Sequence, residues 1–500
     1  MTDNETRALI PSSSFELVNI GTGPQRIVSG MVSDALAAAR QREVSLSTAR
    51  FQIGNYALRD PDYRQILNWA KSLAIEPKEV ISRLEKSDGS SFGAQVTFRV
   101  QDGSIVSFVW NFDLLPISSF NWVNDLCIER IGFIGSNTSD FIIRLHSLRY
   151  LSCSKVGLCA LNLSGVPNLT ELQCGFNTIS QLDLSLVKGL ETLRCFSNQL
   201  TELDLSSVSG LTYLECDANQ IKDLNLSCVP NLSFLRVGSN QLTKLDLTRV
   251  PNLTFIKCSS NQLTELDLSN VPNLKNIWCS GNQITELDLS KVTTLTELDC
   301  GHNQLKELDL CCVPNLTSLN FNCNQLSEVN LACVQDLTIL KCLMNQLIEL
   351  DLSFVPKLTK LDCRDNQIRV LNLSKVPILT DLECCGNHLA ALDLLYVPDL
   401  FRLFCKNMQL TKLDLSRVPN LSTLHCDSNQ LTNLDLSSVP KLSNLSCSSN
   451  KITQLDLSKV RYLFRLDCRK NRLAELDLRR TRGLDYSLFV DKGVAVKKYQ

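Results

Sequence analysis

The stretch LTELDCGHNQLKELDL, residues 295–310, contains two near-copies of one phrase, LTELDC and LKELDL, which start ten residues apart. The first copy ends in Cys300 and the second in Leu310, so this position accepts Cys in place of a larger apolar side chain. Counting by 21 residues in both directions from Cys300 gives sixteen positions between Cys153 and Cys468 without an insertion or deletion, and fourteen of them are Cys. A constant period of this length is typical of a solenoid, in which each repeat forms one coil.

Two further positions keep the same step. Asn stands three residues after the Cys position in every repeat except those of Val156 and Met408, and Asp or Asn stands nine residues after it. The repeat is L-x-x-L-x-C-x-x-N-x-L-x-x-L-D-L-S-x-V-P-x. Its first half closely resembles the strand-and-loop segment of a leucine-rich repeat, and its second half nearly repeats the first, as in the nested 21-residue bacterial class called IRREKO. The resemblance covers residues 145–480 and implies a fold rather than a function.

We therefore expect a leucine-rich repeat solenoid of about sixteen β-coils, whose strands form one parallel sheet. Within x-L-x-C-x, the alternation of a strand points Leu and Cys inward. The second phrase, L-x-x-L-D-L, predicts extended chain rather than a helix, so both sides of a coil advance by about 4.8 Å. Ordinary horseshoes bend because helices are thicker than this spacing, so the sheet should be only gently curved.

The Cys column has a structural interpretation. Free Cys is a small hydrophobe, and Val237 and Phe321 fill the same column, so the position requires an apolar body rather than sulfur chemistry. Thiols stacked about 4.8 Å apart are too distant for disulfides or a shared zinc ion. We expect reduced, inert thiols, with no metal and no cofactor. Any redox sensitivity should lie at cysteines outside the ladder, although plain surface thiols are the simpler interpretation; these are Cys228, Cys311, Cys312, Cys323, Cys333 and Cys385.

The Asn column should satisfy backbone groups at a corner of the coil, both in its own loop and in the next one. Met408, preceded by Asn407, therefore predicts a local irregularity. The column nine residues after the Cys holds twelve Asp and four Asn. Stacked carboxylates repel each other, which a bound cation would relieve. However, the Gly-rich loops that bind calcium in other repeats are absent, and a cation site would be poorly served by Asn at four of its positions. We therefore favour the interpretation that this column is a solvent-exposed face beside the Ser of L-D-L-S.

The first 130 residues lack the repeat. We expect residues 1–30 to be flexible and 31–130 to form an α+β capping domain. Its predicted elements are helices at 32–42, 60–73 and 76–86 and a hairpin over 94–115, centred on Asp102 and Gly103, which seals the first coil. The helices at 60–73 and 76–86 are joined by LAIEP, and this pair faintly resembles a helix-turn-helix motif. Acidic residues outnumber basic ones in this region, so we expect no binding to nucleic acid.

Residues 481–500 should form a C-terminal cap around the strand-like LFVDKGVAVKK. The basic side chains of the stretch 469–500 are interpreted as a solvated face, with an anionic partner as the lesser alternative. The net charge of -2 gives no general attraction to nucleic acid or anionic membranes. No apolar run is long enough to span a membrane, and the start, MTDNETRALIPSSSFELV, does not resemble a signal peptide, so we expect a cytoplasmic location and no membrane partner.

The side chains exposed on the concave sheet indicate where a partner could bind. Each strand exposes the residues three before, one before and one after the Cys position, and on successive repeats these include several aromatic side chains. Clustered exposed aromatics mark interaction surfaces. The predicted partner-binding residues are Phe196, Tyr213, Phe234, Phe255 and Trp278, with a weaker patch at Ile339, Leu343 and Met344. The alternatives are that the N-terminal domain folds onto these aromatics, or that they pack only on one another.

The sequence offers no catalytic constellation. Its four His have no metal-binding spacing, and no P-loop, dinucleotide fingerprint or G-x-S-x-G motif occurs. We therefore expect a non-enzymatic scaffold that binds a protein partner on the concave sheet. Two alternatives stay open: a secreted bacterial effector whose activity lies in the N-terminal domain, or a structural or adhesive surface protein. The oligomeric state is not indicated.

Overall fold

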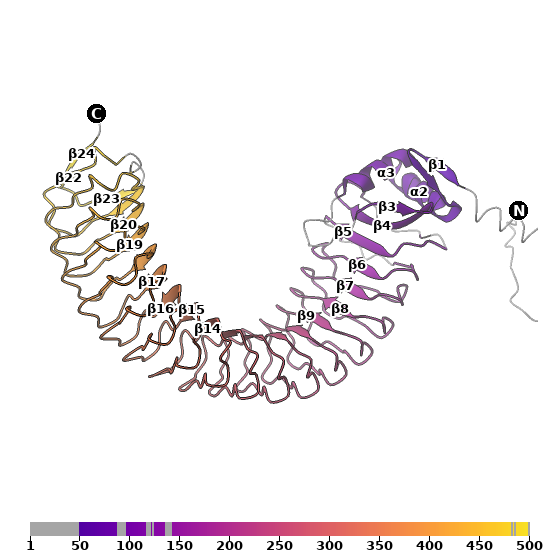
Figure 1. Ribbon diagram of the computed structural model, residues 1–500. Helices are drawn as coiled ribbons and strands as arrows, with labels where there is room; N and C mark the ends of the chain where they lie inside the picture. Colours follow the sequence, from indigo (N-terminus) through magenta and orange to yellow (C-terminus); the bar gives the residue numbers. More distant parts are fainter. Residues whose placement is uncertain are drawn as a thin grey trace, which may run out of the picture.

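The computed structural model describes residues 50–87, 97–116, 122, 125–135, 143–481, 484 and 487–498. The predicted flexible segment 1–30 and the predicted helix 32–42 lie outside these residues. The described chain forms a long solenoid that curves into an open arc, with an α+β region at its N-terminal end (Figure 1).

The α+β region begins with a short antiparallel hairpin and two helices and ends with a second hairpin. Its elements are β1 (Phe51–Ile53), β2 (Tyr56–Leu58), α2 (Asp60–Leu73), α3 (Pro77–Lys86), β3 (Arg99–Gln101) and β4 (Ser104–Asn111). Both helices predicted here are confirmed to within one residue. The turn between β3 and β4 is also confirmed: Asp102 and Gly103 have φ values of 50° and 77°, the left-handed conformation that a two-residue hairpin turn requires.

The second hairpin covers the open edge of the solenoid. Strand β4 pairs in parallel with β5 (Arg130–Ile134), and β5 pairs in parallel with the first strand of the repeats. Trp110 of β4 lies opposite Phe133 of β5, and Phe133 takes the register position that Cys holds in later coils. Trp69 of α2 meets Trp110 edge-on at 4.9 Å, so large aromatic side chains fill the end of the core.

The sixteen repeats each contribute one three-residue strand, and every strand pairs in parallel with its neighbours at a step of 21 residues, as Phe234 with Phe255. The strands are β6 (Tyr150–Ser152), β7 (Glu171–Gln173), β8 (Thr192–Arg194), β9 (Tyr213–Glu215), β10 (Phe234–Arg236), β11 (Phe255–Lys257), β12 (Asn276–Trp278), β13 (Glu297–Asp299), β14 (Ser318–Asn320), β15 (Ile339–Lys341), β16 (Lys360–Asp362), β17 (Asp381–Glu383), β18 (Arg402–Phe404), β19 (Thr423–His425), β20 (Asn444–Ser446) and β21 (Arg465–Asp467).

The strands line the inner side of the arc, and the rest of each coil is extended or turned chain (Figure 1). Residues 143–481 are described without a gap and contain no helix, as the second phrase of the repeat predicts. The solenoid bends so far that both of its ends point to the same side of the arc (Figure 1), which is more curvature than the repeat pattern led us to expect. No helix among the described residues is long and apolar enough to cross a membrane.

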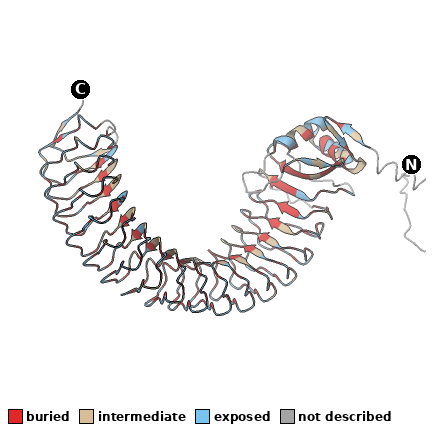
Figure 2. Ribbon diagram, viewed as in Figure 1, coloured by how far each residue is buried: buried red, intermediate tan, exposed pale blue. Residues whose placement is uncertain are grey.

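One continuous apolar core runs through the coils (Figure 2). The middle residue of every repeat strand is buried, and so is every residue of the Cys column, including Val237 and Phe321. The ladder cysteines are free thiols, and burial raises the pKa of Cys258 to about 12. These findings agree with the interpretation of the Cys column as a buried apolar position.

The Asn column joins neighbouring coils through buried hydrogen bonds. Asn198 donates from Nδ2 to the carbonyl oxygens of Cys174 and Cys195, at 3.0 and 3.1 Å, and its Oδ1 accepts the Ile179 N–H at 3.0 Å. The expectation that each Asn reaches the next coil is therefore wrong, because the partner coil is the preceding one. At Met408 the chain is irregular, as predicted, because Gln409 has a positive φ of 63°.

The residue two positions after the Cys position has positive φ in all sixteen coils. Most of these residues are not glycine, so the sequence pattern did not reveal the conformation. The left-handed turn lets an N–H reach the neighbouring coil, as Ser239 N donates to Ser259 O at 2.8 Å. Strain that is costly for one residue is thus compensated by a regular hydrogen-bond ladder.

The Asp column caps turns. Asp267 Oδ1 accepts the N–H of Ser269 at 2.9 Å, and Asn225 makes the same bond to Ser227 at 3.0 Å. Asn can replace Asp because the bond needs an oxygen acceptor rather than a charge. The backbone N–H and hydroxyl of Ser269 lower the pKa of Asp267. The column is a row of solvated turn caps, in keeping with the favoured interpretation.

The C-terminal segment adds one more partial coil. Strand β23 (Leu488–Phe489) pairs in parallel with β21, and β24 (Ala495–Lys497) pairs in parallel with β22 (Glu475–Asp477). The strand-like sequence therefore contains two short strands, with a turn between them. The Arg469 guanidinium lies 5.0 Å from the Phe489 ring centre and pairs with Asp467 at 2.6 Å. This basic side chain is engaged within the cap.

Candidate interaction surface

Four aromatic side chains follow one another on the concave sheet, and we call them the aromatic strip: Tyr213, Phe234, Phe255 and Trp278. The register places the first three directly side by side on β9, β10 and β11. Tyr213 and Phe234 stack with ring centres 4.2 Å apart, and Phe234 and Phe255 stack at 4.4 Å. Trp278 of β12 meets Phe255 edge-on at 5.2 Å. All four are partly buried, so the strip is a continuous aromatic surface with one side in contact with solvent.

The α+β region does not fold onto the strip. Strands β5 to β8 separate it from β9, and it occupies the end of the arc (Figure 1). The described residues therefore leave the concave side of the strip open. The rings do pack on one another, as the other alternative proposed, but this packing leaves them partly exposed rather than enclosed.

Phe196 belongs to a separate aromatic pair. It meets Phe176 of the preceding coil at 5.0 Å, and Phe176 is 53 % exposed. The Phe196 ring lies so close to Gly175 that a Cβ there would come within 2.9 Å of it. Phe176 was not predicted, because it lies two residues after the Cys position, where the left-handed turn points it outward.

The weaker predicted patch is not continuous. Ile339 starts β15 and Leu343 follows its end, so the two are about 13 Å apart along extended chain. Met344 is 55 % exposed and its Sδ lies 3.9 Å from Cys323 Sγ. The patch is therefore divided along the chain, unlike the aromatic strip, whose rings are in contact.

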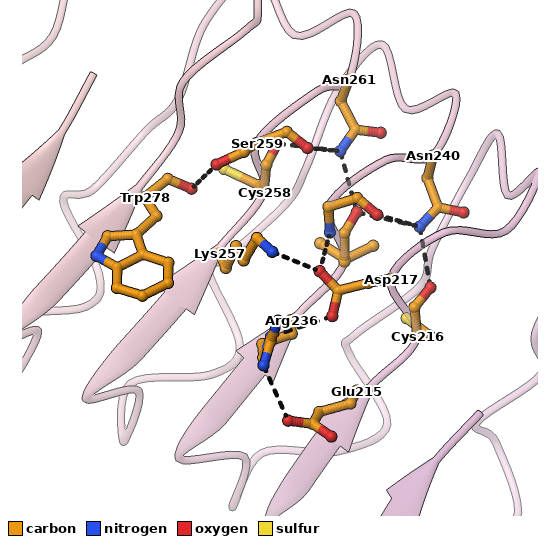
Figure 3. A network of polar contacts seen from close by, with 12 residues as sticks. Glu215, Cys216, Asp217, Arg236, Asn240, Lys257, Cys258, Ser259, Asn261 and Trp278 are labelled. Carbon is orange, nitrogen blue, oxygen red and sulfur yellow. Dashed lines mark hydrogen bonds and ion pairs between the residues drawn. The ribbon is translucent and has the colours of Figure 1, made fainter. Parts of the chain in front are cut away.

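A column of paired charges runs beside the strip (Figure 3). Glu215 lies between two guanidinium groups, with Arg194 Nε at 3.5 Å and Arg236 Nη1 at 3.4 Å. Asp217 pairs with Arg236 Nε at 3.2 Å and with Lys257 Nζ at 3.5 Å. The two acidic side chains belong to one coil, Arg194 belongs to the coil before it, and Arg236 and Lys257 belong to the two coils after it, so the charges compensate one another within the protein.

Asp217 also depends on a glycine. Its Oδ1 accepts the N–H of Gly238 on the next coil at 3.1 Å, and a Cβ at Gly238 would come within 2.9 Å of that oxygen. The carboxylate thus occupies space that a side chain would fill. Asp217 lies one residue after the Cys position, in the same column as Phe196, and was not among the residues predicted for this surface.

Tyr213 links the strip to this charge column. Its hydroxyl donates to Glu215 Oε1 at 2.7 Å, and the Arg194 guanidinium lies 4.8 Å from its ring centre. Burial, together with the hydrogen bond to Glu215, raises the pKa of Tyr213 to about 12. The polar end of Tyr213 is therefore satisfied internally, and the strip presents mainly aromatic carbon to solvent.

The C-terminal half of the concave face repeats the pattern of internally paired charges. Arg364 bridges Asp362 at 2.6 Å and Glu383 at 3.0 Å. Phe404 and His425 form a ring pair at 4.7 Å, and burial lowers the pKa of His425. This pair was not predicted because His425 was considered only as a metal ligand or catalytic group. Within the described residues, no group of three or more His, Cys, Asp or Glu side chains is placed to hold a metal ion.

Comparison with known proteins identifies the repeats. The family described as "Leucine Rich repeats (2 copies)" matches residues 251–291 and 293–333. No curated protein sequence matches the chain. Among solved structures, the functional domain of InlJ from Listeria monocytogenes, which is described as including a cysteine ladder, is 34 % identical, with 62 % of this chain and 69 % of that chain covered and a TM-score of 0.60.

Two more distant structures share the fold. YopM from Yersinia enterocolitica is 24 % identical over 87 % of this chain and 98 % of its own, with a TM-score of 0.61. The plant peptide hormone receptor RGFR1, in complex with RGF2, is 18 % identical over 76 % of this chain and 74 % of its own, with a TM-score of 0.57. The fold and its concave surface define a solenoid repeat protein. The chain belongs to the leucine-rich repeat family, and its 21-residue period fits the nested bacterial class.

Proposed function

We propose that this protein is a non-enzymatic scaffold that binds a protein partner on its concave sheet. Leucine-rich repeat solenoids typically serve as protein-interaction scaffolds. The observation that carries the proposal is the aromatic strip, which is continuous, partly exposed and open toward the inside of the arc. Large rings that are already held by stacking lose little conformational entropy when a partner covers them.

The charge column indicates the kind of partner. Because Glu215 and Asp217 are paired with Arg194, Arg236 and Lys257, the surface beside the strip has no large excess of one sign. A protein surface with an apolar centre and a mixed polar rim suits it better than a nucleic acid or an anionic membrane. The complex of RGFR1 with RGF2 is in keeping with a binding role for this fold.

The proposed division of the chain follows from this role. The solenoid, residues 145–480, carries the binding surface, and residues 31–130 and 481–500 cap its two ends against solvent and self-association. We place the protein in the cytoplasm, where the free thiols of the ladder stay reduced.

The test compares two triple variants. The first is Tyr213→Ser, Phe234→Ser and Phe255→Ser, which removes the stacked part of the strip. The matched control is Phe354→Ser, Tyr396→Ser and Tyr462→Ser, which removes aromatics that are 44 %, 46 % and 76 % exposed and lie outside the concave strands. Circular dichroism must first show that both variants keep the wild-type fold.

Each full-length protein is immobilised and exposed to a lysate of the source organism, and a captured protein is then purified and titrated by calorimetry. The control should bind with the wild-type Kd, while the strip variant should bind at least about 100-fold more weakly, as expected for aromatic hot spots. Equal binding by both variants would show that the strip is only internal packing. Equal loss in both would point to a general effect of removing aromatic surface.

A further inference from the structure

Two cysteines outside the ladder approach each other between neighbouring coils. Cys311 lies in the turn between β13 and β14, and Cys333 lies in the corresponding turn between β14 and β15. The Cys333 thiol donates to Cys311 Sγ at a sulfur–sulfur distance of 2.9 Å. Both are free thiols; Cys311 is exposed and Cys333 is partly exposed. The contact therefore joins two coils at a surface that a small molecule can reach.

The ladder thiols differ from this pair both in their exposure and in their hydrogen-bond partners. They are buried, and they donate to backbone carbonyls, as Cys300 Sγ to Asn320 O at 3.5 Å and Cys342 Sγ to Asp362 O at 3.4 Å. Side chains stacked in one column keep their Cβ atoms near the strand spacing of about 4.8 Å, which is too far for a disulfide. Cys311 and Cys333 are 22 residues apart rather than 21, so their contact is diagonal and escapes this limit.

We propose that Cys311 and Cys333 form a redox-modification site, at which a small-molecule disulfide oxidises the two thiols to an intramolecular disulfide. The Cys333 thiolate attacks one sulfur of the oxidant, forms a mixed disulfide and releases one small thiol. The Cys311 thiolate then attacks the Cys333 sulfur and releases the second small thiol. The protein loses two electrons and two protons, and the oxidant gains both, so one disulfide is exchanged for another.

The surroundings of the pair set the order of these steps. Asp309 Oδ1 accepts the Cys311 N–H at 2.9 Å, which holds its carboxylate beside the thiol. The contact with Cys333, followed by that with Asp309, raises the pKa of Cys311 above its usual value. Because the thiolate is the nucleophile, the Cys311 thiol beside the Asp309 carboxylate is a poor first attacker, and we assign it the role of resolving thiol.

The disulfide would change the mechanics of the solenoid. It would cross-link the turns of two successive coils near the middle of the chain, close to β14 and β15. The arc is the sum of small bends between neighbouring coils, so a covalent link at this point restricts bending behind the concave sheet. Oxidation would then make the middle of the scaffold stiffer without touching its buried ladder.

Peptide mapping of the full-length protein tests the site directly. The reduced protein is incubated with oxidised glutathione, remaining thiols are alkylated under denaturing conditions, and the chain is cleaved after glutamate. Cleavage at Glu307, Glu328 and Glu349 places Cys311 and Cys333 in separate peptides, 308–328 and 329–349. The wild type should give these two peptides linked by a disulfide, with two fewer alkylated cysteines than the reduced protein.

Variants assign the linkage to its residues. Cys311→Ser and Cys333→Ser should each lose the linked peptides, whereas the matched control Cys312→Ser, at the neighbouring thiol, should keep them. Oxidation should also raise the Tm of the wild type and of Cys312→Ser but not of Cys311→Ser. Linked peptides that persist in Cys311→Ser, or glutathione adducts in place of an internal linkage, would overturn the proposal. So would a wild type that keeps all of its thiols.

Discussion

The side-chain Oδ1 of Asn240 accepts a hydrogen bond from the N–H of Ile221 at 3.0 Å, although the two residues belong to different coils. The Nδ2 of Asn240 donates at the same time to the carbonyl oxygens of Cys216 and Val237, at 3.0 and 3.1 Å. One buried amide thus satisfies backbone groups of two neighbouring coils. The repetition of this arrangement ties each coil to the one before it.

Replacing Asn240 by Leu should destabilise the solenoid. Leu fits the apolar surroundings but leaves the Ile221 N–H without its acceptor and removes one of the two donors to the Cys216 carbonyl, at a cost of about 2 kcal/mol in the free energy of unfolding. Urea unfolding followed by circular dichroism measures the loss, and amide hydrogen exchange should show reduced protection at Ile221. The control is Asn252→Ala, because Asn252 is exposed and donates only a long bond to Pro230 O at 3.3 Å; it should change stability by less than about 0.5 kcal/mol.

Replacing Met408 by Asn should stabilise the protein. Leu389 stands in the same place in its coil as Ile221 does in the coil of Cys216. Met408 cannot accept a hydrogen bond from the Leu389 N–H, and it cannot donate one to the Cys384 carbonyl. Restoring the amide should add about 1 kcal/mol to the free energy of unfolding. Thermal unfolding of Met408→Asn beside wild type measures the gain. A lower Tm would mean that the positive φ of Gln409, at 63°, has locked this loop into a shape that Asn cannot use.

The pH dependence of the α+β region should report on Asp62. Its carboxylate is buried and accepts the Ile105 N–H at 2.9 Å, and burial raises its pKa to about 6. Between the unfolded pKa of about 4 and the folded value, the folded state binds a proton that the unfolded state lacks, so stability falls as pH rises through this window. Asp62→Asn keeps an acceptor for Ile105 without the charge.

The variant should therefore be more stable than wild type at pH 7, by about 1 kcal/mol, and should show a flatter stability profile between pH 4 and 6. Hydrogen exchange at Ile105, followed across this range, measures the effect locally. The exposed turn-cap Asp267 has a lowered pKa, so its contribution has the opposite sign and is lost only as pH falls below about 4. An unchanged profile in Asp62→Asn would contradict the assignment.

The charge column should control the ionisation of Tyr213. Glu215→Gln removes the carboxylate that accepts the Tyr213 hydroxyl, so the pKa of Tyr213 should fall from about 12 toward its ordinary value. Ultraviolet difference titration against Tyr213→Phe isolates this residue. The same change leaves Arg194 and Arg236 with less compensation and should lower the free energy of unfolding by about 1 kcal/mol, allowing for their partial exposure. Glu171→Gln, on the strand two coils earlier, serves as the control.

Much of the fold follows from the sequence because the repeat is strict. Once Cys300 and its relatives define the period, every residue can be assigned to a column, and alternation within a strand decides which columns face inward. The helix from Asp60 to Leu73 and the turn at Asp102 and Gly103 could also be predicted, since helical spacing and turn chemistry are local properties. The columns likewise brought Tyr213, Phe234 and Phe255 together.

Other relationships could not be obtained from the columns. The period does not say in which direction an Asn side chain reaches, so its bond to the preceding coil had to be seen. The repeat period does not determine the orientation of an aromatic side chain either, and Phe196 pairs with Phe176 rather than with Tyr213. The aromatic end of the core, where Trp110 and Phe133 continue the Cys column, lies outside the repeat and so outside its rules.

The sequence by itself determined the solenoid, its parallel sheet, its buried thiol ladder and the face on which its aromatics gather, because each depends only on a residue's place in a 21-residue period. Tertiary structure alone decided the open arc, the pairing of Asp217 with Arg236 and Lys257, and the contact of Cys311 with Cys333. These depend on small bends that accumulate from coil to coil and on diagonal approaches between columns, which a one-dimensional period does not contain.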